Sequence, residues 1–328
     1  MTSTRSKSRL NIRALCAAMI TLLMPSASPA ESPSKVISWV GNIDEWNRSM
    51  DVDELRLSCR REPQVCLKSA GYHSREQGVN RITLAMVVEA DRAIEYAASY
   101  GRGSRSEPRV TSIGIDDFAK TLLRWKRSLG SGVTLDRLVS RVIDATLEGN
   151  PALEFSVTLY EDDLSSTILR DELAPSVRAR IDRVSLYLHY RGNGPNYPAY
   201  VRRAKALFPN ARMVAGVYAY DRVDYLPCRQ GRSAKCSTEE EFRLFERALR
   251  EQFRLLADKK IAAIELYPGY FGKEADWPPW SQPRICDPGR RDECVALTRR
   301  MRERLLIELR GSRAQMQNET GRSGRRGS

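Results

Sequence analysis

The chain has 328 residues, with 54 Lys and Arg against 41 Asp and Glu, and carries a formal net charge of +13. This length suits one large domain with extra loops. Only two histidines are present, which excludes a multi-histidine metal centre. The basic residues are scattered along helix-like segments, so we expect no nucleic-acid partner. Binding to an anionic polymer or to the cell envelope stays open as an alternative.

The first 30 residues have the pattern of a signal peptide. Four basic residues precede a short apolar stretch at 14–24, and Ser28 and Ala30 supply small residues before a cleavage site. The stretch is shorter than the roughly 20 apolar residues that span a bilayer. We therefore expect cleavage after Ala30 and an exported chain, periplasmic or extracellular, without a later transmembrane segment. An uncleaved N-terminal anchor is the alternative.

Residues 31–310 are expected to form one domain in which strands alternate with helices. The expected strands are 36–40, 82–88, 111–117, 154–160, 184–190, 212–219 and 261–267. The expected helices are 91–100, 119–127, 134–148, 164–180, 198–207, 238–258 and 291–310. This alternation predicts an α/β fold with a parallel sheet.

Seven strands favour a (β/α)8 TIM barrel with one degenerate strand, which we place between residues 45 and 78. An open, doubly wound sheet is the alternative. Residues 311–328 are polar and rich in Gly, Arg and Ser, and we expect them to form a disordered basic tail.

Six cysteines follow the leader and form three local couples. These are Cys59 with Cys66, Cys228 with Cys236, and Cys286 with Cys294. An even number in an exported chain predicts disulfides, and each couple brackets a loop-like stretch, so we expect local pairing. Zinc binding is disfavoured because no C-x-x-C pair exists and neither histidine is near a couple. Free buried thiols are the remaining alternative.

The expected strands end on acidic, aromatic or basic residues. In a β/α barrel the C-terminal ends of the strands build the active site. Because successive strand residues face opposite sides, alternate residues at these ends should point inward. The expected inward residues are Asp116, Tyr160, Asp162, Tyr187, His189, Arg191, Tyr218, Tyr220, Glu265 and Tyr267, with Glu89 and Trp39 as additional candidates. Burying so many ionisable groups is costly in a plain core, although a satisfied polar plug is the alternative.

Carboxylates are the groups of this set that suit catalysis. No G-x-S-x-G elbow, Walker loop or G-x-G-x-x-G motif follows a strand, so we expect neither a serine hydrolase nor a cofactor. Two opposed carboxylates among aromatic rings suit glycoside hydrolysis, in which one acid protonates the leaving oxygen and the other attacks or activates water. The catalytic candidates are Asp116, Asp117 and Glu265. The substrate-binding candidates are Trp39, Tyr160, Asp162, Tyr187, His189, Arg191, Tyr218, Asp221 and Tyr267.

Three of the strand ends resemble those of a known group of proteins. They read Ile-Asp116-Asp117-Phe118, Gly-Val-Tyr218-Ala-Tyr220-Asp221-Arg222 and Ile-Glu265-Leu-Tyr267-Pro268-Gly269. They are similar to exported bacterial proteins grouped with glycoside-hydrolase-type barrels, over roughly residues 36–300. The resemblance implies a TIM barrel that acts on a glycan. The group's two glutamates on the fourth and seventh strands are not cleanly matched, and the pair Asp116-Asp117 and Glu265 are their nearest equivalents.

Two other functions fit the same residues. A non-catalytic barrel that binds a glycan or associates with the envelope would have its carboxylates paired with Arg191 or Arg222. A divalent cation could instead bind Asp116, Asp117 and Glu265, because hard cations accept oxygen ligands. The enzyme hypothesis predicts that Glu265→Gln folds normally and loses activity. We expect a carbohydrate substrate, and a monomer is the simplest assembly.

Overall fold

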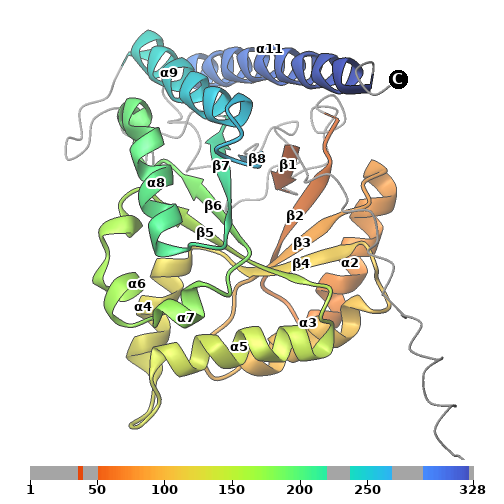
Figure 1. Ribbon diagram of the computed structural model, residues 1–328, viewed down its shortest axis with the longest axis vertical. Coiled ribbons are helices and arrows are strands. Elements are labelled where there is room, and N and C mark those ends of the chain that lie inside the picture. The colour runs from red at the N-terminus through yellow and green to blue at the C-terminus, as the bar shows by residue number, and fades with distance from the viewer. Residues whose placement is uncertain (1–35, 40–50, 220–236, 268–290, 325–328) are drawn as a thin grey trace, which may run out of the picture. The chain divides into compact units, whose positions relative to one another are not determined.

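A computed structural model describes residues 36–39, 51–219, 237–267 and 291–324, all within one compact unit, Ser34–Ser328. Eight parallel strands form a closed barrel in chain order (Figure 1). They are β1 (Val36–Trp39), β2 (Glu54–Cys59), β3 (Ile82–Met86), β4 (Val110–Ile115), β5 (Glu154–Tyr160), β6 (Arg183–Tyr187), β7 (Arg212–Tyr218) and β8 (Ala263–Tyr267). The TIM-barrel prediction is confirmed, and the open doubly wound sheet is excluded.

Helices follow most of the strands and cover the outside of the barrel. The α-helices are α2 (Pro63–Gln77), α3 (Ala93–Ser104), α4 (Phe118–Ser128), α5 (Leu135–Gly149), α6 (Thr167–Asp171), α7 (Pro175–Arg178), α8 (Tyr197–Leu207), α9 (Thr238–Ala257) and α11 (Arg291–Gly324). Two short 3-10 helices, η1 (Asp163–Ser165) and η2 (Arg191–Asn196), lie at the strand ends. In the described residues no helix is long and apolar enough to cross a membrane.

The strand that the sequence analysis could only place between 45 and 78 is β2. It pairs with β1 and β3 and closes the barrel. Its sequence alternates polar with apolar residues, and both Leu55 and the inward Arg56 are fully buried. Parallel strands usually read as continuous apolar runs, so this alternation with charged inward residues hid the strand.

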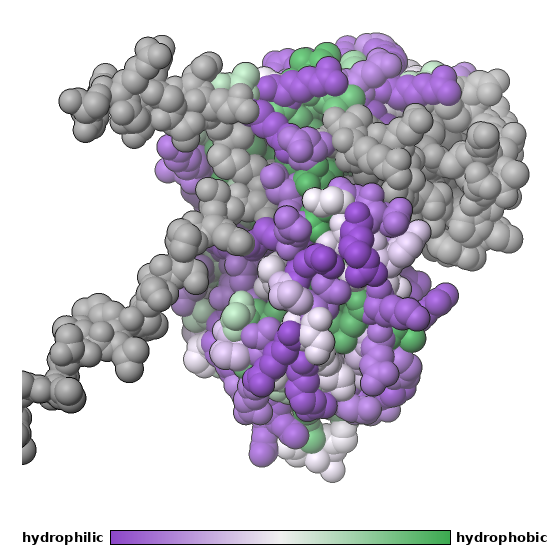
Figure 2. Space-filling model, turned by 90° about the vertical axis from the view of Figure 1, so that its right-hand side faces the viewer, coloured by the Kyte–Doolittle hydropathy of each residue, from purple (hydrophilic) through white to green (hydrophobic). Residues whose placement is uncertain are grey.

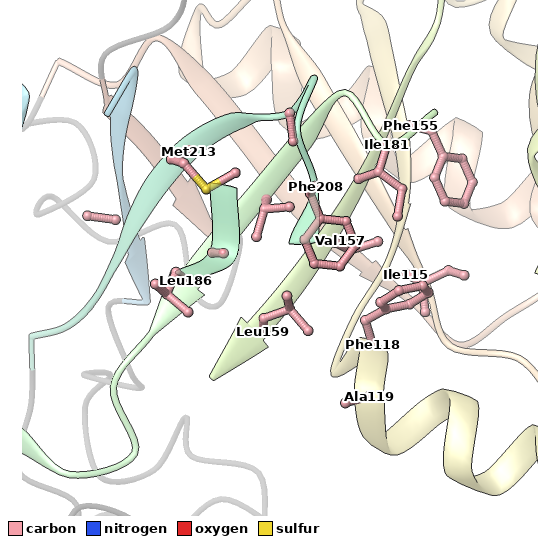
Figure 3. Close-up of a cluster of buried hydrophobic side chains, with 14 of the residues drawn as sticks. Ile115, Phe118, Ala119, Phe155, Val157, Leu159, Ile181, Leu186, Phe208 and Met213 are labelled. Atoms are coloured by element: carbon pink, nitrogen blue, oxygen red, sulfur yellow. The ribbon is translucent and has the colours of Figure 1, made fainter. Parts of the chain in front are cut away.

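The main hydrophobic core lies between the outer face of the barrel and the helices. Figure 3 shows Phe155, Val157 and Leu159 of β5 on the face that also meets Phe118 of α4. Trp125 of α4 is fully buried, and its indole Nε1 donates a 2.9 Å hydrogen bond to the carbonyl of Val88. These contacts hold α4 beside the end of β4, where two acidic candidates lie.

A second, polar layer fills the barrel interior near the N-terminal ends of the strands. Arg183 Nη1 lies 2.7 Å from Glu54 Oε1, and Thr83 Oγ1 donates to the same oxygen at 2.5 Å. Burial by itself would raise the pKa of Glu54, but Arg183 and Thr83 together hold it below its ordinary value. Buried ion pairs persist only when further hydrogen bonds satisfy them, as here.

Helices α9 and α11 lie next to each other (Figure 1). Two ion pairs join them, Arg300 to Glu239 at 3.0 Å and Arg304 to Glu246 at 3.2 Å. Helix α11 continues to Gly324, beyond residue 310, where the sequence analysis ended it. Figure 2 shows one face of the molecule, on which hydrophilic residues, in purple, predominate and hydrophobic areas, in green, are small.

The cysteine prediction needs a correction. Cys59 and Cys66 are free, buried thiols and form no disulfide. Cys59 ends β2 and Cys66 lies in α2, and both pack in the hydrophobic core as small side chains. Hydrogen bonding from Cys59 lowers the pKa of the Cys66 thiol to about 6. The other expected couples lie outside the described side chains, as do the leader, Tyr220, Asp221, Arg222 and the loop after Tyr267.

Candidate functional site

Glu265 of β8 accepts four hydrogen bonds inside the barrel. Its Oε1 receives Trp39 Nε1 at 2.9 Å and the Tyr187 hydroxyl at 2.8 Å. Its Oε2 receives Arg56 Nη1 at 3.1 Å and the Ser185 hydroxyl at 2.6 Å. The side chain is fully buried. Three other strands thus fix this carboxylate in place and occupy both of its oxygens.

Arg56 is a site residue that sequence reasoning missed. Its guanidinium forms a buried ion pair with Glu265, and its Cζ lies 4.9 Å from the centre of the Trp39 ring. The signal that could have found it is the alternation of β2, in which Glu54, Arg56 and Ser58 share one face. The binding hypothesis expected Arg191 or Arg222 to pair with a carboxylate. At Glu265 the pairing cation is Arg56.

Asp116 follows β4 and presents a carboxyl with one engaged oxygen. Its Oδ1 accepts the Thr158 hydroxyl at 2.7 Å and the Asp117 amide at 3.0 Å. Among the described residues, none donates to Oδ2. Burial raises the pKa of Asp116, the charge of Asp117 adds to this, and Arg56 opposes it. Arg56 thus pairs directly with Glu265 and also acts on the Asp116 carboxyl through its charge.

Asp117 has a left-handed backbone, with φ 44° and ψ 53°, at the start of α4. This conformation is uncommon for residues other than glycine, although aspartate tolerates it better than most. The Asp117 side chain is 43% exposed and lies 4.0 Å from Lys120 Nζ. The sharp turn separates the two carboxyls, so Asp116 faces Thr158 and Asp117 faces solvent and Lys120.

Five aromatic side chains form an aromatic belt at the strand ends, made of Trp39, Tyr160, Tyr187, Tyr218 and Tyr267. Neighbouring ring centroids lie 5.6 Å apart for Trp39 and Tyr267, 5.5 Å for Tyr267 and Tyr218, 4.9 Å for Tyr218 and Tyr187, and 6.2 Å for Tyr187 and Tyr160. The Tyr160 and Tyr218 hydroxyls are 2.7 Å apart. The belt confirms that the strand ends bring these distant residues together.

A glycine on β7 makes room for the belt. A Cβ added at Gly216 would lie 2.3 Å from Cγ of Tyr187, which is closer than real contacts allow. The Tyr187 ring therefore fills the space that a side chain at 216 would take, and its hydroxyl reaches Glu265.

Not every ring of the aromatic belt is open to a ligand. His189 stacks on Tyr160 with centroids 3.6 Å apart and an interplanar angle of 8°, and Lys120 Nζ lies 5.0 Å from the same ring. His189 therefore covers one face of Tyr160, and that face is closed to a sugar ring. Tyr267 is the most exposed member, at 38%.

His189 and two acids meet beside this stack. Its Nδ1 lies 2.9 Å from Asp162 Oδ1, and its backbone amide donates to Glu161 Oε2 at 2.7 Å. Burial raises the pKa of Glu161, which also accepts the Tyr190 amide at 3.0 Å. In the described part of the chain, Glu161, Asp162 and His189 are the group whose ligand atoms are close enough for a metal, within 4.8 Å. Hydrogen bonds already account for the closeness of these three residues. They are also different residues from the Asp116, Asp117 and Glu265 that the sequence analysis offered as a cation site.

Arg191 lies elsewhere than the sequence analysis placed it. Strand β6 ends at Tyr187, so the alternation does not extend to residue 191, which begins η2. The Arg191 guanidinium pairs with Glu241 of α9 at 2.9 Å and lies 5.8 Å from the Phe245 ring. Arg191 thus ties η2 to α9, and its Nη2 donates to the backbone carbonyl of Tyr218 at 3.3 Å, beside the aromatic belt.

Comparisons with known proteins agree with this architecture. No protein-family model and no curated protein matches the sequence. The intracellular xylanase TsXylA of Thermoanaerobacterium saccharolyticum, solved with xylotetraose, matches with a TM-score of 0.52 and 9% identity, over 77% of this chain and 90% of that one. The endo-1,4-β-xylanase of Caldicellulosiruptor owensensis matches with a TM-score of 0.50 and 10% identity, over 75% and 89%. The chain has a glycoside-hydrolase-like TIM-barrel fold.

A third match covers a larger protein only in part. β-Glucuronidase 2 of Bacteroides uniformis has a TM-score of 0.48 and 13% identity, over 70% of this chain. The chain spans 28% of that protein's length. At such identities the likeness shows the fold, and function has to be argued from the site.

Proposed function

We propose that this barrel binds a glycan at the aromatic belt and hydrolyses a glycosidic bond, with Asp116 as the proton donor. The observation that carries the proposal is the state of Asp116. Its pKa is raised by burial, and its Oδ2 accepts no hydrogen bond from the described residues. A carboxyl that keeps its proton to a higher pH than an ordinary aspartate suits a general acid for the leaving oxygen.

Glu265 is proposed as the opposing, fixed carboxylate. Hydrolysis passes through a transition state with positive charge near the anomeric carbon, which a nearby carboxylate stabilises. Because Trp39, Tyr187, Arg56 and Ser185 already occupy both oxygens, we propose that water, and not Glu265, attacks the sugar. The Asp116 carboxylate, which has given its proton to the leaving oxygen, takes the proton of that water and is restored as the acid. The role of Glu265 is then electrostatic.

Sugar binding without turnover is the second candidate. The complete burial of Glu265 favours it, because a carboxylate enclosed by four donors contributes no nucleophile. Tyr267 would still offer an exposed ring for the apolar face of a sugar.

A paired assay of cleavage and binding separates the two candidates. The purified protein is incubated with chromogenic β-xylosides and β-glucuronides and with xylan, because the fold neighbours include xylanases and a β-glucuronidase. Turnover that Asp116→Asn abolishes, with binding retained, supports the hydrolase. Binding without turnover selects the second candidate, and neither binding nor turnover across a broad glycoside panel contradicts both.

We also propose that the chain is exported. The proposal rests on the basic residues, the short apolar stretch and the small residues Ser28 and Ala30. Expression with the leader intact should yield a mature protein that begins at Glu31, as read by mass spectrometry. A purified protein that still carries residues 1–30 would contradict cleavage.

A further inference from the structure

We infer that Thr158 is a positioning residue, which holds the proton of Asp116 on Oδ2 and so fixes the oxygen that gives the proton to the leaving group. This inference rests on the proposed function and deepens it, because it names the residue that orients the acid. Thr158 was not among the candidates of the sequence analysis.

Thr158 of β5 lies beside Asp116, the residue that follows β4. The two strands pair Ile115 with Val157, so the next residue of each strand meets the other. The Thr158 side chain is buried. Its hydroxyl oxygen lies 2.7 Å from Asp116 Oδ1 and 2.7 Å from the Asp117 amide nitrogen. These two contacts account for the hydrogen bonds of this hydroxyl to the described residues.

The two contacts determine where the Thr158 hydroxyl proton points. A hydroxyl has one proton to donate and two lone pairs that accept. The Asp117 amide can only donate, so the Thr158 oxygen accepts from it, and the Thr158 proton is directed to Asp116 Oδ1. The same amide also donates to this oxygen at 3.0 Å. Asp116 Oδ1 therefore faces two donors.

The proton of the Asp116 carboxyl then belongs on Oδ2. A proton on Oδ1 would point at a hydroxyl that is itself a donor, and would leave the buried Thr158 proton without an acceptor. Oδ2 accepts from none of the described residues and is not among the buried atoms that lack a partner, so it reaches solvent. Thr158 thus holds one oxygen as an acceptor and leaves the other to carry a proton that a ligand can take.

The test removes the Thr158 hydroxyl with little change in the shape of the side chain. In Thr158→Val the ionised Asp116 carboxylate loses one donor, so its pKa should rise above the wild-type value. Thr158→Ser keeps the hydroxyl and should return the pKa close to the wild-type value. Carboxyl NMR titration measures these pKa values without any substrate, and Asp116→Asn assigns the resonance. The other titratable groups that act on this carboxyl, Asp117, Arg56 and Tyr160, are the same in every Thr158 variant.

The rate of glycoside cleavage is the second measurement. With its acid proton no longer confined to Oδ2, Thr158→Val should cleave the best substrate of the panel about 10-fold more slowly, and its alkaline limb should move to higher pH. Thr158→Ser should recover the rate and the pH profile. Thr111→Val is the matched control, because the buried Thr111 hydroxyl on β4 bonds to none of the described residues. It should change neither the Asp116 pKa nor the rate.

An Asp116 pKa or a rate that is the same in the wild type and in Thr158→Val overturns the inference, and so does a Thr158→Ser protein that behaves like Thr158→Val. The proposed function survives these results if the wild type cleaves a glycoside and Asp116→Asn does not. If Thr158→Val does not fold, neutron diffraction of wild-type crystals below the Asp116 pKa decides, because a deuteron on Oδ1 overturns the inference and one on Oδ2 supports it. A wild type that cleaves no glycoside contradicts the proposed hydrolysis, whereas the titration still shows whether Thr158 holds the Asp116 proton.

Discussion

The imidazole ring of His189 lies flat against the ring of Tyr160, with centroids 3.6 Å apart and planes 8° apart. The same imidazole faces Asp162 through Nδ1, and the Tyr160 hydroxyl meets that of Tyr218. The stack therefore joins the loop after β6 to β5 and, through the hydroxyl pair, to β7. This edge of the barrel mouth is held by direct side-chain contacts.

Replacement of His189 by alanine should raise the pKa of Asp162. Burial raises this pKa, but the hydrogen bond and charge of His189 outweigh it and hold it below the ordinary value. A lowered carboxyl pKa stabilises the fold above the unfolded-state pKa, and this contribution disappears as pH falls through the lowered value. Carboxyl NMR titration measures the shift, with His73→Ala as the control. An Asp162 titration that is the same in both variants would contradict the pairing.

The raised pKa of Asp163 should make the folded state less stable as the pH rises through the weakly acidic range. Burial raises its pKa to about 6, the Tyr160 amide opposes this, and the charge of Asp162 adds to it. The folded state then holds a proton that the unfolded state releases near pH 4, so the wild type loses stability between about pH 4 and 6. Asp163→Asn does not titrate and should gain on the order of 1 kcal/mol relative to the wild type over this range. Urea unfolding at several pH values tests this, and a constant difference would speak against it.

The sequence could predict the barrel because seven strands alternate with helices and carry polar groups at the same ends. It placed the missing strand only within residues 45–78 and did not find Arg56, because a strand with charged inward residues resembles an amphipathic loop until its neighbours are known. It placed Arg191 inward because the alternation of side chains does not show where a strand ends. Strand β6 ends at Tyr187, four residues earlier. Cys59 and Cys66 were close in sequence, but spacing alone does not distinguish a disulfide from two packed thiols.

The sequence alone could not assign different roles to the two carboxyls. Asp116 and Glu265 are both inward acids at strand ends, but the first has a raised pKa and the second is enclosed by four donors. This difference comes from residues on four other strands, and no local pattern around either acid reveals it.

Glu265→Gln should cost more stability than the sequence analysis expected. The amide nitrogen of glutamine would face Arg56 Nη1 or Trp39 Nε1, both of which can only donate. Removing one charge of a buried ion pair leaves the other uncompensated, at a cost of about 3–5 kcal/mol. Urea unfolding measures it, and Asp116→Asn, which keeps an acceptor for Thr158, should change stability far less. Equal stability of the two variants would contradict the buried network.

Gly216→Ala should displace Tyr187 and disturb the aromatic belt. The new Cβ would lie 2.3 Å from the Tyr187 ring, which has no free space because its hydroxyl is held by Glu265 and Trp39. Overpacking of this kind costs about 1–3 kcal/mol, and sugar affinity should fall with it. Gly130→Ala is the control, since nothing lies within 4 Å of its Cβ position. Thermal unfolding should separate the two variants, and similar melting temperatures would count against the close packing at 216.

The central claim is that Asp116 donates a proton to the leaving group at the mouth of the barrel. The rate of 4-nitrophenol release from 4-nitrophenyl β-xyloside, or from the best substrate of the panel, is measured from pH 4 to 9 for the wild type and Asp116→Asn. Because burial raises the pKa of Asp116, the wild-type rate should fall on the alkaline side as this carboxyl ionises, at a higher pH than an ordinary aspartate would give. The Asp116→Asn rate should be at least about 100-fold lower and should lack that alkaline limb. An Asp116→Asn enzyme with wild-type rates and the same pH profile would contradict the account.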